Sequence, residues 1–183
     1  MPAPTTEWTL EMLHALPDDG KRYELVDGEL LVSPSPSRPH QRVVMEFTLA
    51  LAPWARAHGL ELCAAPAEIA FTPARAVQPD LFVVPCADGK WIRDARELTR
   101  LVLAIEVLSP STAHVDRGHK KRVYMEQGVA EYWIVDADFR RVERWRPGAE
   151  HPEVLEATLS WTPPGDGATL ELDLVELFRL ALD

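Results

Sequence analysis

The chain of 183 residues is 46% hydrophobic and 26% charged, which fits one globular domain with a core of its own. Its formal net charge of −10 argues against a broad nucleic-acid-binding surface. No apolar run approaches the roughly 18 residues of a membrane span, and the first residues lack a signal-peptide pattern. We therefore expect a cytoplasmic protein without membrane contact.

The N-terminal part of the chain is predicted to contain a helix, a hairpin and a second helix. The first helix is expected over residues 5–16, with Thr5 or Thr6 as its cap. Asp27-Gly28 lies between two apolar-rich runs and predicts a hairpin, because both turn positions tolerate positive φ. Apolar residues at helical spacing predict the second helix over about 39–58.

The rest of the chain is predicted to alternate strands with helices. Strand 101–108, helix 116–127 and strand 132–135 should form a crossover between parallel strands. The other expected elements are strands over 62–71, 79–84 and 141–146 and an amphipathic helix over 170–182. This order predicts an α/β fold (α+β with a mixed sheet) that has a helix on either side, an N-terminal hairpin and short terminal helices.

Charge is distributed unevenly along the predicted single domain, residues 1–183. Residues 150–183 carry eight acidic residues and one base, so 147–183 is interpreted as an acidic C-terminal extension. The segment 114–124 instead carries four bases and one acid. If the protein binds phosphate, this helix is the expected place, with Arg117, Lys121 and Arg122 as the contacting residues.

Two acidic residues, Asp80 and Glu106, stand against apolar strand-like sequence. A carboxylate in or beside a buried strand is costly unless a positive charge or a metal ion meets it. If the two strands pair, both carboxylates can reach one Mg²⁺ ion, with the backbone carbonyl near Val107 as a third oxygen ligand. Mn²⁺ is an expected substitute for Mg²⁺.

A basic residue is expected beside this pair. Asp116, Lys120 and Tyr124 recur every four residues and so share one face of the predicted helix. Lys120 could then position or activate a water molecule and offset charge on a phosphate. Separately, Asp80 fits a turn, Glu106 a buried ion pair and Lys120 a solvated helix face. Together, in this order, they favour a divalent-metal phosphodiesterase site.

Several separated motifs carry a family resemblance. They are Tyr23–Glu29, Ser33–Gln41, Gln78-Pro79-Asp80, Ala104–Thr112, the Asp116/Lys120/Tyr124 spacing and Gly128–Asp136. In this order they resemble the Uma-two family of the PD-(D/E)xK nuclease superfamily, over about residues 20–146. The resemblance implies a restriction-endonuclease-like fold, dependence on Mg²⁺ and hydrolysis of phosphodiester bonds.

The chain departs from the superfamily pattern at one position. The superfamily usually has a lysine two residues after the glutamate, where this chain has Leu108. Lys120 matches the place from which this family supplies its lysine. Glu24 and His40 also match family positions and are expected at the mouth of the site, although a solvent-facing strand residue and a helix-start residue explain them equally well.

Two functions remain open from the sequence. The first is a Mg²⁺-dependent endonuclease that acts on nucleic acid, with DNA the preferred substrate. Cutting both strands of a duplex needs two sites, so a homodimer is expected. The second is a catalytically inactive module of the same fold with a dimerising or regulatory role, which the charge of −10 and Leu108 favour.

Overall fold

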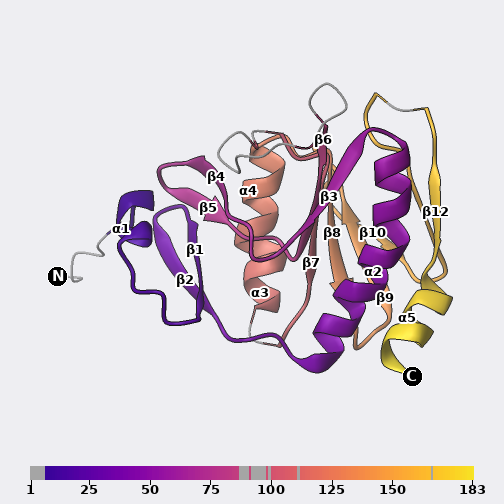
Figure 1. Ribbon diagram of the computed structural model, residues 1–183, viewed down its shortest axis with the longest axis horizontal. Coiled ribbons are helices and arrows are strands. Elements are labelled where there is room, and N and C mark those ends of the chain that lie inside the picture. The colour runs from indigo at the N-terminus through magenta and orange to yellow at the C-terminus, as the bar shows by residue number, and fades with distance from the viewer. Residues whose placement is uncertain (1–6, 87–90, 92–97, 99, 111, 166) are drawn as a thin grey trace.

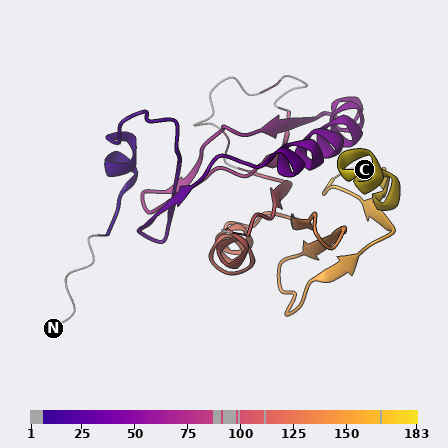
Figure 2. The same ribbon diagram turned by 90° about the horizontal axis from the view of Figure 1, so that it is seen from below.

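The molecule is built around a central sheet with helices on both faces (Figure 1). The computed structural model describes residues 7–86, 91, 98, 100–110, 112–165 and 167–183. Figure 2 shows helix α2 (Arg38–Ala57) on one face of this sheet and helix α4 (Lys121–Glu126) on the other. The prediction of a mixed sheet between helices is confirmed.

The central sheet has six strands in the order β10-β9-β8-β7-β6-β3. Strands β7 and β8 pair in parallel, and the other neighbours are antiparallel. The parallel pairing confirms the predicted crossover, and β8 and β9 confirm the hairpin after it. The strand bounds are β3 Leu60–Ala64, β6 Leu81–Pro85, β7 Leu103–Val107, β8 Glu131–Asp136, β9 Arg141–Trp145 and β10 Glu153–Leu155.

A second sheet of four strands holds the N-terminal hairpin. Its order is β2-β1-β5-β4, with β1 Arg22–Val26, β2 Glu29–Ser33, β4 Ile69–Thr72 and β5 Arg75–Val77. The turn between β1 and β2 has φ of 51° at Asp27 and 81° at Gly28, which confirms the predicted hairpin. The single strand expected over 62–71 is wrong, because it is divided between β3 and β4, which belong to different sheets. Pro66 lies between them and cannot donate to a ladder.

The two N-terminal helices differ in how well the sequence located them. Helix α1 (Leu10–His14) is shorter than the expected 5–16, and Thr9 caps it by accepting from the backbone of Met12 at 3.3 Å. Thr5 and Thr6, the expected caps, lie outside the described residues. Helix α2 confirms the prediction over 39–58 and is capped by Ser37.

The crossover helix is interrupted by a wider turn. The predicted helix over 116–127 consists of α3 (Ala113–Val115), the π-helix η2 (Asp116–Lys120) and α4. It therefore begins three residues earlier than expected. A π-helical turn bonds i to i+5, and such turns occur frequently at functional sites. Gly128 follows the helix with φ of 73°, the left-handed conformation in which glycine commonly ends a helix.

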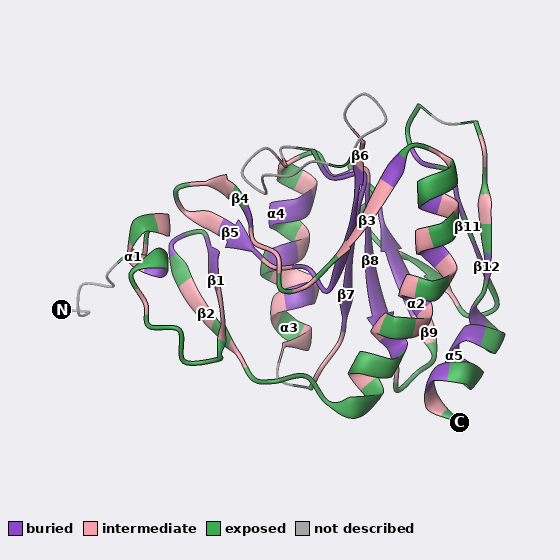
Figure 3. Ribbon diagram, viewed as in Figure 1, coloured by how far each residue is buried: buried purple, intermediate pink, exposed green. Residues whose placement is uncertain are grey.

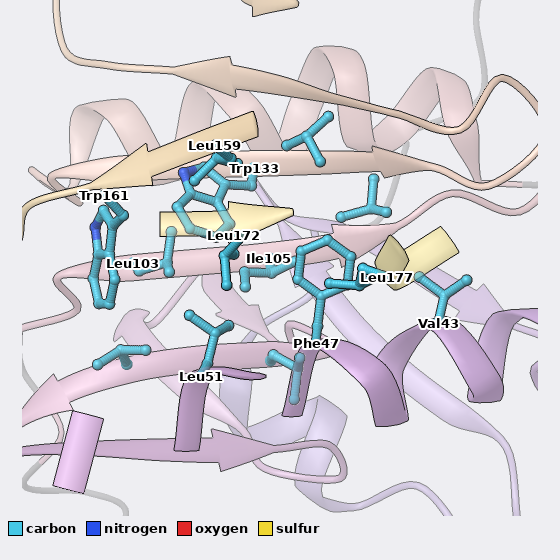
Figure 4. Packing of buried hydrophobic residues seen from close by; sticks show 14 of the residues in the cluster. Val43, Phe47, Leu51, Leu103, Ile105, Trp133, Leu159, Trp161, Leu172 and Leu177 are labelled. Atoms are coloured by element: carbon cyan, nitrogen blue, oxygen red, sulfur yellow. The ribbon is translucent and has the colours of Figure 1, made fainter. Parts of the chain in front are cut away.

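The C-terminal segment packs onto the central sheet. Strands β11 (Thr158–Trp161) and β12 (Leu170–Asp173) form a hairpin, and helix α5 (Leu174–Leu182) follows. The predicted helix over 170–182 therefore starts at Leu174, where Asp173 caps it. Figure 4 shows Leu177 of this segment beside Phe47 of α2. Although acidic, residues 147–183 contribute directly to the core.

The central strands are buried on both faces (Figure 3). Successive side chains of a strand point to opposite faces, so Ile105 packs towards α2 and Ala104 packs with Tyr124 on the α4 side. Glu106 shares the parity of Ala104 and so faces the α4 side. Among the described residues, none of the helices combines the length and apolar composition needed to cross a bilayer.

Candidate functional site

The pairing register of β6 and β7 brings Asp80 and Glu106 together. Leu81 pairs with Ile105 and Phe82 with Ala104 in the antiparallel ladder. One residue further, at the ends of the strands, Asp80 and Glu106 face each other on the side of α4. The backbone N–H of Val107 donates to Oδ2 of Asp80 at 2.9 Å, which holds the first carboxylate against the second strand.

Glu106 is held from the crossover helix. Its Oε1 atom accepts a hydrogen bond from Nζ of Lys120 and another from the hydroxyl of Tyr124, each at 2.9 Å. Burial raises the pKa of Glu106, although the positive charge of Lys120 opposes this shift. The predicted helix face thus does turn towards the carboxylates.

Lys120 lies among three carboxylates. Its Nζ atom is 2.9 Å from Glu24, 2.9 Å from Glu106 and 3.6 Å from Asp116. Burial lowers the pKa of the ammonium, but the charges of these three residues outweigh burial and raise it. Lys120 is therefore a retained positive charge at the centre of an acidic cluster.

Asp80 is held by basic side chains from two other elements. Nη1 of Arg22 donates to Oδ1 at 2.8 Å, and Nε2 of His40 lies 3.1 Å from Oδ2. Burial would raise the pKa of Asp80, but the hydrogen bond from His40 and the charge of Arg22 lower it to about 2. The Asp80 carboxylate is thus ionised at neutral pH.

Glu24 and Asp116 complete the acidic cluster. Oε1 of Glu24 accepts from the backbone N–H of Gln78 at 2.7 Å, which joins β1 to the chain just before Asp80. Burial raises the pKa of Asp116. Its Oδ1 atom is buried and has no hydrogen-bond partner in the part of the chain that the structure describes. Its nearest cation is Nζ of Lys120, at 3.6 Å.

Arg22 is the site residue that the sequence reasoning did not single out. It precedes Glu24 by two positions in β1, and residues two apart in a strand share a face. That spacing was the available signal, once Glu24 was placed at the site. Nη2 of Arg22 also donates to the carbonyl of Gln78, two residues before Asp80.

The carboxylates open into a pocket of about 320 Å³. It lies between β1, the loop before α2, the ends of β6 and β7, and the start of the crossover helix. Asp116 and Lys120 line it from the helix, and Ser109 and Thr112 line it from the segment between β7 and the helix. The remaining lining residues are Gly20, Arg22, Ser33, Pro34, Ser35, Pro36, Ser37, His40, Asp80, Glu106, Val107 and Pro110.

The donor set fits a hard divalent cation of the Mg²⁺ type. Among the described residues, no three His, Cys, Asp or Glu side chains are grouped as a ready metal cage. Mg²⁺ does not need one, because it keeps several waters and is bound through one or two carboxylates. Asp80 and Glu106 supply two such groups at one pocket, and Asp116 lines the same pocket.

The residues predicted to contact phosphate lie outside this pocket. Arg117 bonds to Glu143 at 2.7 Å and to Asp136 at 3.0 Å, both on the hairpin of β8 and β9. Arg122 pairs with Asp27. Lys121 lies 4.3 Å from the centroid of the Trp145 ring. The structure therefore gives each of these three side chains a contact within the chain, away from the carboxylates.

The mixed sheet between helices, with acidic side chains at the ends of two adjacent strands, defines a protein of the restriction-endonuclease-like fold. The sequence model of the Uma2 family, described as "Putative restriction endonuclease", matches residues 10–182. The chain belongs to this family. The match extends beyond the predicted 20–146 and includes the acidic C-terminal segment.

A solved structure has the same fold. It comes from Anabaena variabilis and is described as a "putative nuclease belonging to DUF820". It superposes with a TM-score of 0.75 at 22% sequence identity, covering 95% of this chain and 99% of that one. A comparison with curated proteins found no match.

Proposed function

We propose that this protein is a Mg²⁺-dependent endonuclease that hydrolyses phosphodiester bonds of nucleic acid, with DNA as the preferred substrate. Membership of the Uma2 family and the nuclease description of the structural neighbour support the class of reaction. The observation that carries the proposal is the convergence of Asp80, Glu106 and Lys120 on one pocket.

Asp80 and Glu106 are the residues that would hold Mg²⁺, with the carbonyl of Val107 as the third oxygen; Mn²⁺ would bind to the same set. When bound, the ion supplies a Lewis acid for the phosphate and lowers the pKa of a water molecule. The chain itself keeps the carboxylates in place. The hydroxyl of Tyr124 orients Glu106, and His40 orients Asp80.

Lys120 acts as a donor of positive charge in this scheme. Its raised pKa keeps a proton on Nζ at neutral pH, so the side chain cannot accept a proton from water. It can donate to an oxygen on which negative charge develops, and fixed donors of this kind are worth about 10²–10³ in rate. The carboxylates of Glu24 and Asp116 hold the ammonium in position.

Cleavage assays with matched variants test the proposal. Plasmid and single-stranded oligonucleotides are incubated with the protein and Mg²⁺, Mn²⁺ or no divalent ion. Asp80→Asn and Glu106→Gln should lower the cleavage rate by about 100-fold or more. Glu176→Gln is the control, since Glu176 is an exposed acid of α5 that pairs with Arg179. Equal cleavage by all variants would refute the assignment.

The inactive module is the second candidate, favoured by Leu108 at the usual lysine position and by the internal pairing of Arg117 and Arg122. It predicts that Mn²⁺ binds, that Asp80→Asn removes this binding, and that plasmid and oligonucleotide survive with every protein. Calorimetry beside the cleavage assay thus separates the two functions.

We further propose that the protein is cytoplasmic and that it forms a homodimer. The dimer is expected because two sites are needed to cut both strands of a duplex. Light scattering after size-exclusion chromatography should give twice the chain mass of 20.5 kDa. A monomer that still linearises plasmid would contradict the proposed dimer but would leave the assignment of Asp80, Glu106 and Lys120 to the active site unchanged.

A further inference from the structure

The guanidinium of Arg22 bridges the two carboxylates that would bind the metal ion. Nη1 lies 2.8 Å from Oδ1 of Asp80, and Nη2 lies 3.5 Å from Oε2 of Glu106. Nε is 3.5 Å from Oε2 of Glu24. One cationic side chain therefore contacts three of the four carboxylates of the acidic cluster.

The remaining carboxylate oxygens are committed elsewhere. Oδ2 of Asp80 is held by the N–H of Val107 and by His40. Oε1 of Glu106 is held by Lys120 and Tyr124. The oxygens left for a cation, Oδ1 of Asp80 and Oε2 of Glu106, are the two that Arg22 contacts. A metal ion shared by both carboxylates needs these same oxygens.

Displacement of Arg22 would also break the hydrogen bond from Nη2 to the carbonyl of Gln78, but Arg22 is the more exposed of the two cations. Its side chain is 24% exposed, whereas that of Lys120 is 3% exposed. It lines the site pocket and also a neighbouring groove of about 610 Å³ along α2, where Val44 and Met45 contribute apolar surface. An arginine stem packs well against such a surface while its head stays in water.

We propose that Arg22 is the resident counter-ion of the site and that a divalent cation binds by displacing its guanidinium from Asp80 and Glu106. Without the metal, the guanidinium neutralises carboxylates that would otherwise repel each other. With the metal, the freed guanidinium stays within the pocket, where an incoming phosphate needs a planar donor. This inference rests on the proposed metal site and adds the group that competes for it.

Calorimetric titration with Mn²⁺ measures the competition directly. Arg22→Met keeps an unbranched side chain and removes the charge, so Mn²⁺ should bind about tenfold more tightly than to wild type, because no bound cation has to be displaced. Arg75→Met is the matched control. Arg75 belongs to the same sheet, is similarly buried and pairs with Asp27 and Glu126 instead, so its loss should leave Mn²⁺ affinity unchanged.

Three further measurements test for misfolding, for a general charge effect and for the position of Arg22. Thermal unfolding with and without Mn²⁺ should show that Arg22→Met is folded and gains more stability from the metal than wild type does. Arg22→Lys keeps the charge but cannot bridge both carboxylates. Its Mn²⁺ affinity should therefore lie between that of wild type and that of Arg22→Met. A Mn²⁺-soaked crystal of the wild type should show Arg22 turned away from Asp80.

The outcomes distinguish this inference from the proposed function. If Mn²⁺ binds to wild type and equally or more weakly to Arg22→Met, or if Arg22 still bridges Asp80 and Glu106 beside bound Mn²⁺, the displacement is overturned and the metal site stands. If Mn²⁺ binds to neither protein, both the displacement and the metal site are overturned.

Discussion

The Nζ atom of Lys120 lies 2.9 Å from Oε2 of Glu24, and both side chains are almost fully buried, at 3% and 1% exposure. This ion pair joins the crossover helix to the N-terminal sheet. The same ammonium also contacts Glu106 in the central sheet. One positive charge therefore ties three separate parts of the fold.

Replacement of Lys120 by methionine should destabilise the protein strongly. It leaves buried carboxylates without their cation, a change that typically costs about 3–5 kcal/mol. Urea unfolding followed by circular dichroism measures the loss. Lys121→Met is the control and should cost less than about 1 kcal/mol, since Lys121 contributes a cation–π contact with Trp145.

Removal of Glu24 as well as Lys120 tests why the Lys120→Met variant loses stability. Glu24→Gln in the Lys120→Met background should recover part of the stability, because fewer buried charges then lack a partner. Additive losses in the double variant would show that the two residues do not interact.

The C-terminal helix should be part of the cooperative core. Leu177→Ala removes a side chain that is 6% exposed and packs in the cluster with Phe47, and it should cost about 2–5 kcal/mol. Val175→Ala on the same helix, at 62% exposure, should change stability by no more than about 0.5 kcal/mol. Similar small effects of both changes would mean that α5 docks only weakly.

Two glycine substitutions should have opposite signs. Gly28 has φ of 81°, so Gly28→Ala places a side chain in the left-handed region and should destabilise by about 1 kcal/mol. Gly118 in η2 has ordinary φ and open space around its Cα. Gly118→Ala should therefore stabilise by about 0.4–1 kcal/mol. Thermal melts of the two variants compare them directly, and a destabilised Gly118→Ala would contradict the open space.

Arg117 should matter for stability more than for nucleic-acid binding. Asp136 and Glu143 are each 6% exposed, and Arg117 pairs with both. Arg117→Ala should cost about 1–3 kcal/mol by leaving these acids less well compensated. Fluorescence anisotropy with labelled DNA should show unchanged affinity. A clear loss of affinity at unchanged stability would instead support the phosphate contact predicted from the sequence.

The sequence located the site residues that sit in regular, strongly patterned elements. Glu106 is recognisable because it interrupts an apolar strand, and Lys120 and Tyr124 because they recur at helical spacing. The order of elements also predicted the parallel pair of β7 and β8. In these cases a local period determines the face on which a side chain lies.

The rest of the site depends on contacts between distant segments. Arg22 resembles any charged residue at the start of a hairpin strand, and its role follows only from the docking of β1 beside Asp80. The sequence does not indicate that Arg117 pairs with Glu143 of β9 or that Arg122 pairs with Asp27 of the first hairpin. The π-turn η2 likewise has no periodic signal, because it is a single turn within a helix.

The position of β1 has a consequence for how the site arises during folding. Arg22 and Glu24 belong to the small N-terminal sheet. Asp80 directly precedes β6 and Glu106 lies in β7, both of the large sheet. The large sheet alone holds two carboxylates without a cation, because Arg22 comes from the small sheet and Lys120 from the crossover helix. The cluster is assembled only once the two sheets have docked, so a newly made or partly opened chain carries the residues of the site without the site itself.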